Sequence, residues 1–188
     1  MAFNLPKDLE EFRAYVRDFA EKKIKPIAFQ LDQQKEFPRE IVKEMGQMGL
    51  LGIPFPEEYG GAGLTNKHYS IAVEELSRVD GGVGVICSAH TSLGTWGLNE
   101  FGTEEQKQKY LTKLATGEHI GAFALTEPMA GTDASMQQTT AHISDDGKYY
   151  ILNGSKIFIT NATIADTFIV IAMTDKSKGT HGISAFIV

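Results

Sequence analysis

The sequence is poor in cysteine, because Cys87 is the only one among 188 residues. A single cysteine excludes a disulfide within the chain and suits a reducing compartment. The sequence also lacks an apolar run as long as a membrane-spanning helix, and its beginning lacks the basic-then-apolar profile of a secretory signal. These absences predict a cytoplasmic protein, or a mature chain from which a targeting segment has been removed.

Basic residues are too few and too scattered for a nucleic-acid-binding surface. The chain has 18 lysines and arginines against 24 aspartates and glutamates, which gives a net charge of −6. Neutralising phosphates requires grouped cations, so we expect no nucleic-acid partner. The five histidines are also scattered, with no pair at the spacing of metal ligands, and we expect no metal site.

Apolar residues in the first two thirds recur every three or four positions, which is typical of helices that bury one face. One such stripe covers residues 9–27, where Pro26 is expected to kink or end the helix. Thr103 and Gln106 have the spacing of a capping box, which predicts the start of a helix that ends at Gly117. Further helices are expected over residues 38–49, 67–79 and 81–101.

The pattern changes after Gly117, where short apolar runs alternate with the turn signals Asp145-Asp146-Gly147 and Asn153-Gly154. Helices followed by strands indicate an α+β fold with two segregated parts. We expect an N-terminal all-helical bundle over residues 1–118 and a partial antiparallel β-barrel or sandwich domain over residues 119–188. Strands are expected over residues 149–152, 157–159, 167–172 and 183–188.

The last of these strands reaches Val188 with no turn or polar residue after it. Such an arrangement leaves a sheet edge and an apolar face uncovered. We therefore expect a truncated β-domain. The alternative is a C-terminal strand that docks in the sheet.

Two stretches carry the chemistry, namely residues 121–135 (GAFALTEPMAGTDAS) and residues 154–161 (GSKIFITN). Each contains an apolar, strand-like run that ends in threonine, and the first continues into a turn with proline, glycine and hydroxyl residues. Such a turn can aim backbone N–H groups and hydroxyls at a planar polar ligand that carries phosphates. The alternative is that both are ordinary strand ends and turns.

Together the two stretches resemble the flavin-binding signatures of the acyl-CoA dehydrogenases. The resemblance implies FAD as cofactor, with the backbone of Leu125 and Thr126 and the Thr126 hydroxyl at the pyrimidine edge of the flavin. It implies that Thr132 contacts the pyrophosphate and borders the acyl-CoA substrate, that Phe158 lies against the ring, and that Thr160 lies near N5. The implied cofactor-binding residues are Phe123, Ala124, Leu125, Thr126, Thr132, Phe158, Ile159 and Thr160.

Three departures from the family pattern bear on cofactor affinity. Met129 and Met136 stand where relatives carry smaller residues. Ala162 and Thr163 stand where many relatives have two glycines. If that turn needs positive φ, both residues are expected to be strained there.

The resemblance implies α,β-dehydrogenation of an acyl-CoA, and residues 172–179 (AMTDKSKG) are closest to the short-chain, butyryl-type members. It also implies an electron-transfer flavoprotein as partner and a homotetramer. In the family the catalytic base is a glutamate in a C-terminal helical domain, which no residue here matches, so we expect no catalytic residue in this chain and no activity from it alone. Glu127 is expected to hold its turn by hydrogen bonds, and Glu74 and Glu75 to be solvated or salt-bridged.

Two other functions remain open. The chain can be a non-catalytic module that binds flavin or acyl-CoA, or that serves only in assembly. It can also belong to another enzyme on the same scaffold, such as an acyl-CoA oxidase or a nitroalkane oxidase.

Overall fold

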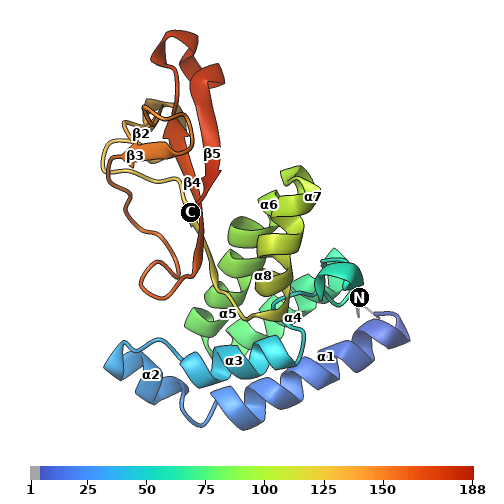
Figure 1. The fold of residues 1–188 in the computed structure, drawn as a ribbon. Helices are drawn as coiled ribbons and strands as arrows, with labels where there is room; N and C mark the ends of the chain where they lie inside the picture. The colour runs from blue at the N-terminus through green and yellow to red at the C-terminus, as the bar shows by residue number, and fades with distance from the viewer. Residues whose placement is uncertain (1–4) are drawn as a thin grey trace.

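The computed structural model describes residues 5–188 and has a helical part and a β-part, which lie at opposite ends of the molecule in Figure 1. Residues 1–4 lie outside the described residues. They belong to the predicted helical region and to the start of the chain, for which no secretory signal is expected. The helical part runs to Thr116, and the β-part starts at Gly121. The helices are α1 Lys7–Phe19, α2 Ala28–Gln34, α3 Arg39–Gln47, α4 Asn66–Val79, α5 Gly81–Ser88, α6 Trp96–Phe101, α7 Glu104–Gln106 and α8 Thr112–Thr116.

Most of these helices begin and end where the sequence predicts. Pro26 lies in the turn that follows the first helix, and Pro38 immediately precedes α3. The Thr103 hydroxyl accepts the N–H of Gln106, whose side chain accepts the Thr103 N–H, so the predicted capping box is confirmed. Wide π-helical turns extend the helices at Ala20–Ile24, Ala89–Thr95 and Lys107–Leu111.

The main core lies where α1, α3, α4 and α5 meet. Side chains of Val16, Met45, Leu76 and Cys87 are all fully buried there. The Cys87 thiol contacts the Leu50 carbonyl oxygen, and burial raises the pKa of this thiol to about 12. Cys87 therefore has the character of a structural thiol of the core.

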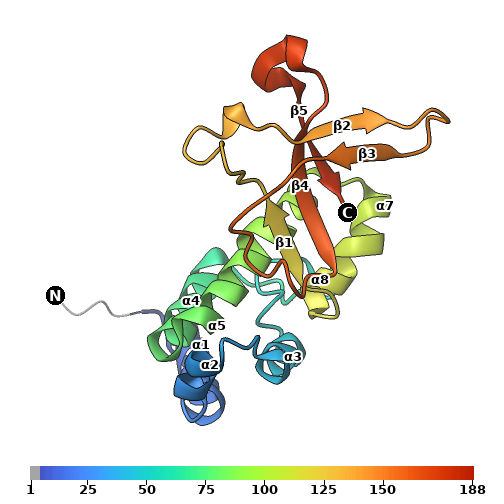
Figure 2. The same ribbon diagram turned by 90° about the vertical axis from the view of Figure 1, so that its left-hand side faces the viewer.

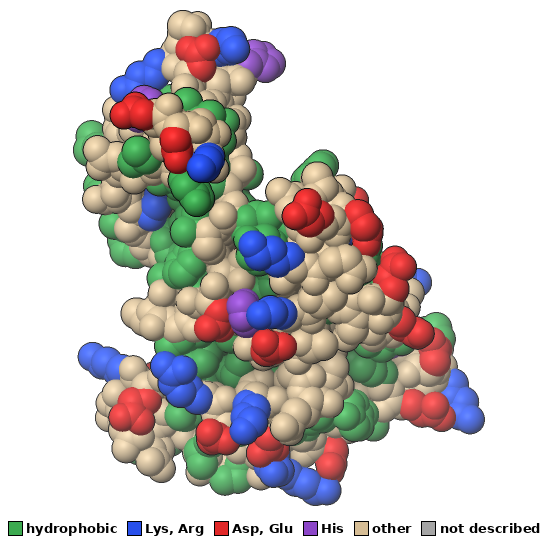
Figure 3. Space-filling view, viewed as in Figure 1, with side chains coloured by type: hydrophobic (Ala, Val, Ile, Leu, Met, Phe, Trp, Pro, Cys, Tyr) green, Lys and Arg blue, Asp and Glu red, His purple; other side chains and the backbone are tan. Residues whose placement is uncertain are grey.

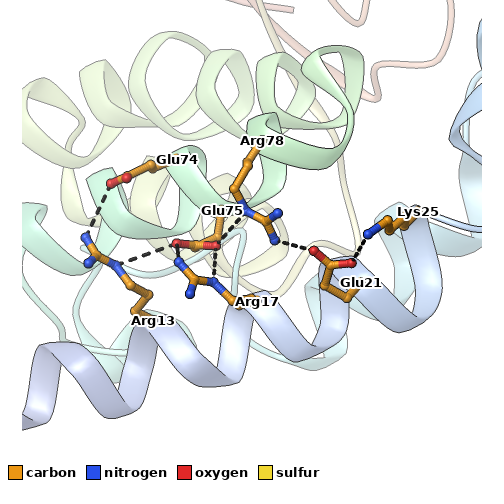
Figure 4. A network of polar contacts seen from close by, with 7 residues as sticks. All are labelled: Arg13, Arg17, Glu21, Lys25, Glu74, Glu75 and Arg78. Carbon is orange, nitrogen blue, oxygen red and sulfur yellow. Dashed lines mark hydrogen bonds and ion pairs between the residues drawn. The ribbon is translucent and has the colours of Figure 1, made fainter.

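An ion-pair network fastens α1 to α4 (Figure 4). Glu75 on α4 is only 1% exposed, and its two oxygens accept two hydrogen bonds from the Arg17 guanidinium, at 2.7 and 2.9 Å. Arg13 on α1 and Arg78 on α4 flank the same carboxylate. Hydrogen bonding to Arg17 lowers the pKa of Glu75 despite the opposing effect of its burial. The expectation of a salt-bridged Glu75 is confirmed.

The β-part forms a five-stranded sheet in which β4 pairs with three other strands, as Figure 2 shows. β1 pairs with β4 in parallel, and a single parallel bridge joins β2 to β4. β2 pairs with β3, and β5 with β4, in the antiparallel direction. The strands are β1 Gly121–Ala124, β2 Thr140–Ile143, β3 Tyr150–Asn153, β4 Thr167–Met173 and β5 Ile183–Ile187.

The sheet corrects two predictions. The sheet contains both parallel and antiparallel pairs, so this part of the chain does not form the expected antiparallel barrel or sandwich. β4 runs parallel to β1 because a long crossover connects the two strands. Residues 157–159 are not a strand, because Phe158 has a φ of 56° and breaks the extended backbone. The predicted turn at residues 145–147 does join β2 to β3, whereas β2 itself was not predicted.

Candidate functional site

The two predicted stretches lie side by side at the outer edge of β1. β1 is the edge strand of the sheet, and β4 occupies its other side. The Ile157 N–H donates to the Thr126 carbonyl oxygen at 2.9 Å. The Asn161 side-chain amide donates to the Gly121 carbonyl oxygen at 3.2 Å. Residues 157–161 therefore run along the strand that carries the first stretch, and the two stretches form one local surface.

Lys156 forms the strongest link between the stretches. Its ammonium group donates to the Leu125 carbonyl oxygen at 2.9 Å and to a Glu127 carboxylate oxygen at 2.8 Å. The Gln137 side-chain oxygen lies 3.4 Å away as a third acceptor. The lysine side chain is only 11% exposed, so the ion pair with Glu127 is shielded from water.

Glu127 anchors the turn that follows β1. Its side chain accepts hydrogen bonds from the backbone N–H groups of Gln138 and Thr139, at the far end of that turn. Burial alone raises the pKa of Glu127, but the Gln138 N–H and the Lys156 ammonium outweigh it and lower the pKa to about 2. The carboxylate is therefore ionised and fully engaged, which confirms the expected role in holding the turn.

Leu125 and Thr126 keep their hydrogen-bond donors free. Their two carbonyl oxygens are occupied by Lys156 and Ile157. Across the described residues 5–188, no acceptor pairs with the N–H groups of Leu125 and Thr126 or with the Thr126 hydroxyl. Both residues are half-buried. This edge therefore offers donors, and no free carbonyl, to a ligand.

The residues from the second stretch present a more exposed surface. Phe158 is 89% exposed even though it is a large apolar side chain. Its left-handed backbone is unfavourable for a residue with a β-carbon, and such strain is often found at ligand sites. Ile159 is half-buried and Thr160 is exposed. Thr132, in the turn held by Glu127, is also exposed.

Phe123 and Ala124 lie differently from the other predicted residues. Ala124 is buried and pairs with Val170 in the sheet. Phe123 lines a groove of about 1060 Å³ between the β-part and the helices α6 and α7. Figure 3 shows this hollow on the molecular surface. None of the other predicted cofactor residues lines it, so this groove and the edge site share only Phe123.

The departures from the family pattern cause no backbone strain at residues 162 and 163. Within residues 5–188, positive φ at non-glycine positions occurs only at Lys35, Phe158 and Asn161. The tight turn after Thr160 therefore places the left-handed residue at Asn161, a residue type that tolerates it. Met129 and Met136 are exposed and do not pack in the core.

His90 is a site-supporting residue that the sequence did not reveal. It lies on the fully buried side of the central helix, in Ala89–Thr95. Its Nδ1 accepts the Gly121 N–H at 3.0 Å, and its Nε2–H donates to the Leu114 carbonyl oxygen at 3.0 Å. Burial lowers the pKa of His90 to about 4, so the ring is neutral. A lone histidine in an apolar run gives no sequence signal for such a long-range contact.

Glycine allows the same helix to approach β1 closely. A β-carbon on Gly94 would lie 2.6 Å from the carbonyl carbon of Gly121. That distance is too short for any real side chain. The first residue of β1 is therefore fixed by His90 and Gly94 together, which sets the position of the edge site relative to the helical part.

Comparison with known proteins now identifies the family. Residues 6–118 match the acyl-CoA dehydrogenase N-terminal domain, and residues 122–188 match the acyl-CoA dehydrogenase middle domain. The chain belongs to the acyl-CoA dehydrogenase family. The resemblance carried by residues 121–135 and 154–161 is thereby confirmed.

Individual acyl-CoA dehydrogenases are close relatives. The short-chain specific acyl-CoA dehydrogenase of Clostridium acetobutylicum is 60% identical over 188 residues, which are 100% of this chain and 49% of the relative. The solved butyryl-CoA dehydrogenase from Megasphaera elsdenii has a TM-score of 0.94 at 49% identity and covers 100% of this chain and 50% of that chain. An acyl-CoA dehydrogenase from Bacillus anthracis, solved with FAD, has a TM-score of 0.90 at 42% identity and covers 98% of this chain and 32% of that chain. The chain spans about half the length of the curated relatives it matches.

Residues 5–188 of this acyl-CoA dehydrogenase chain contain neither a metal-binding cluster nor a candidate membrane span. Over residues 5–188, no three side chains of histidine, cysteine, aspartate or glutamate gather in a way that could hold a metal ion. No helix in the same range is both long enough and apolar enough to cross a membrane.

Proposed function

We propose that residues 1–188 form the helical and flavin-contacting parts of an FAD-dependent dehydrogenase that acts on short-chain acyl-CoA thioesters. The observation that carries this proposal is the pairing of the two stretches at the edge of β1, where Ile157 and Lys156 bind the carbonyls of Thr126 and Leu125. The relatives named above are acyl-CoA dehydrogenases, and the short-chain ones support the choice of acyl length.

The donors at this edge fit one side of a flavin. The pyrimidine edge of the isoalloxazine presents mainly acceptors, at O2, N1 and O4. The N–H groups of Leu125 and Thr126 and the Thr126 hydroxyl supply the matching donors, while their carbonyls are already occupied. Donors that are fixed before the ligand arrives bind it at little reorganisation cost.

The other predicted contacts complete the proposed cofactor and substrate sites. Phe158 offers its exposed ring as an apolar cover for the isoalloxazine, and the Thr160 hydroxyl lies two residues further along the same segment. Thr132 is proposed to donate to the pyrophosphate and to border the acyl-CoA. We assign supporting roles in the strand to Phe123 and Ala124 and in the loop to Ile159.

Flavin, when bound, supplies the hydride acceptor for the β-carbon of the acyl group. The residues of this chain bind and orient it: Leu125 and Thr126 aim donors at the region where negative charge gathers on reduction. Phe158 shields one side of the site from water. None of these groups abstracts a proton.

The base that removes the α-proton is proposed to come from outside residues 1–188. Glu127 lies beside the edge site, but Lys156 and two backbone N–H groups occupy it. Its pKa of about 2 also makes it a very weak base. We therefore propose that residues 1–188 alone are inactive, and that a glutamate in a C-terminal helical domain, as in the family, completes the site.

The proposal extends to the organisation of the whole protein. We divide this chain into a helical domain over residues 1–118 and the start of a middle β-domain over residues 119–188, whose barrel or sandwich closes only with further strands. We propose a homotetramer that passes electrons to an electron-transfer flavoprotein. A cytoplasmic, reducing location is supported by the buried free thiol of Cys87.

Two measurements on the protein with its full native chain test this function. Titration with FAD is expected to give stoichiometric binding, and butyryl-CoA with an artificial electron acceptor is expected to give turnover under anaerobic conditions. Residues 1–188 alone are expected to give no turnover. FAD binding without turnover in the full chain favours the non-catalytic module, rapid reoxidation by oxygen favours an oxidase, and no FAD binding contradicts the proposal.

A further inference from the structure

We propose that Lys156 is a positioning residue that joins the two stretches of the flavin site through one ammonium group. This inference rests on the proposed flavin site and deepens it. Lys156 lies in the second stretch, yet all its hydrogen-bond partners lie outside that stretch. It therefore joins segments that are distant in the sequence.

The three ammonium protons match three acceptors. The Leu125 carbonyl belongs to the flavin-facing end of the first stretch, and the Glu127 carboxylate begins the turn that follows. The Gln137 side chain belongs to the end of the same turn. A lysine has three donors and no acceptor, so this set uses its full capacity.

The turn that carries Thr132 is linked to the same group through Glu127. The Glu127 carboxylate also holds the backbone N–H groups of Gln138 and Thr139, which close the turn. Loss of the ammonium leaves this carboxylate 4% exposed without its cation. The position of Thr132 then becomes less fixed.

Lys156 also decides which polar groups the edge offers. By occupying the Leu125 carbonyl oxygen, it leaves the Leu125 N–H as the free group of that residue. Without Lys156, the Leu125 carbonyl oxygen would be a free acceptor at an edge proposed to meet the acceptors of the flavin. The ammonium therefore makes the edge selective for an acceptor-rich ligand as well as rigid.

The experiment compares four variants of the protein with its full native chain. Lys156→Met removes the ammonium and keeps the apolar stem, and Lys156→Arg keeps the charge. The double variant Lys156→Met/Glu127→Gln removes both charges, so no unpaired buried carboxylate remains. Lys148→Met is the matched control, because Lys148 is an exposed lysine of the same β-part and its side chain makes no hydrogen bond within residues 5–188.

The expected result separates positioning from simple stabilisation. Lys156→Met should weaken FAD binding by about tenfold or more, because the donors of Leu125 and Thr126 are no longer held in place, and should shift the visible flavin absorption bands. Lys156→Arg should recover part of the affinity, and Lys148→Met should match the wild type. The double variant should regain melting temperature relative to Lys156→Met while its FAD affinity stays low. The proposal is overturned if the double variant recovers both its melting temperature and its FAD affinity, or if Lys156→Met binds FAD as tightly as the wild type.

A measurement without flavin distinguishes this proposal from the function it rests on. Hydrogen exchange in the FAD-free protein should rise together in residues 121–127 and 154–161 of Lys156→Met, and should not rise in Lys148→Met. No rise overturns the role of Lys156 even when FAD binds the wild type normally. Failure of the wild type to bind FAD contradicts the proposed function, and with it the flavin part of this inference.

Discussion

Two buried carboxylates, Glu75 in the helical part and Glu127 in the β-part, are held by cations in different ways. Glu75 is surrounded by three arginines from two helices, in a network that continues to Glu74 at one end and to Glu21 and Lys25 at the other (Figure 4). Glu127 and Lys156 form a single pair, and unpaired donors remain beside it at Leu125 and Thr126. Several cations around one buried carboxylate fasten two helices together. The single pair leaves donors unused beside it, on the surface that we propose binds the flavin.

The largest expected effect comes from breaking the helical network. Glu75→Gln leaves three guanidinium groups around a neutral side chain, and we expect the free energy of unfolding to fall by about 3 kcal/mol. FAD affinity should not change, because the network lies away from the edge of β1. Urea unfolding and FAD titration of the same variant measure the two quantities.

Glu74→Gln provides the control for that prediction. Glu74 is well exposed and lies 3.5 Å from Arg13, so its loss should cost under about 0.5 kcal/mol. Equal losses in Glu74→Gln and Glu75→Gln would contradict the distinction between a buried network and a surface pair.

His90 links the two parts and gives a pH dependence. Its pKa is lowered from 6.5 to about 4, so the folded protein disfavours protonation that the unfolded chain accepts. The contribution of His90 to the free energy of unfolding is fully present above pH 6.5 and is lost as the pH falls to about 4. The loss is about 3 kcal/mol. Urea unfolding between pH 7 and 4.5 should show most of this loss.

Two comparisons make the assignment to His90 specific. His90→Leu should be less stable than the wild type at pH 7, because the Gly121 N–H and the Leu114 carbonyl lose their partner, and should show a smaller fall with pH. Glu127, whose pKa is about 2 against an ordinary 4.5, loses its contribution only below pH 4.5. A wild type as stable at pH 4.5 as at pH 7 would show that His90 is not the buried neutral group described.

The smallest expected effect has the opposite sign and lies in the site. Phe158→Gly removes an exposed side chain from a backbone with φ of 56°, so the protein should gain about 1 kcal/mol or less of stability. FAD binding should weaken at the same time, because the apolar cover is lost. Melting temperature measures the gain in stability, and FAD titration measures the loss of affinity. A lower melting temperature than the wild type would show that Phe158 supports the fold.

The helical part was predictable because its signals are local. The stripe over residues 9–27, the prolines at 26 and 38, and the capping box from Thr103 to Gln106 each act within one or two turns. The β-part was predictable only in pieces. β4 and β5 have clear apolar runs, but the parallel pairing of β1 with β4 depends on a crossover that no local pattern encodes.

The candidate site divides in the same way. The motifs around Thr126 and Thr160 are visible in the sequence, and so is the family they resemble. The groups that hold them are not, because Lys156 contacts Leu125 across 31 positions and His90 contacts Gly121 across another 31. The left-handed conformation of Phe158 was also missed, since its sequence neighbours have the composition of a strand.

The outer edge of β1 has one further consequence, for how copies of this protein behave toward each other. An edge strand is a template on which a foreign strand can align, and proteins block such edges in order to stay dispersed. Here three side chains do so. His90 accepts the Gly121 N–H, Asn161 donates to the Gly121 carbonyl oxygen, and Lys156 donates to the Leu125 carbonyl oxygen. The contacts that shape the proposed ligand site thus also leave fewer backbone groups on which another polypeptide could pair.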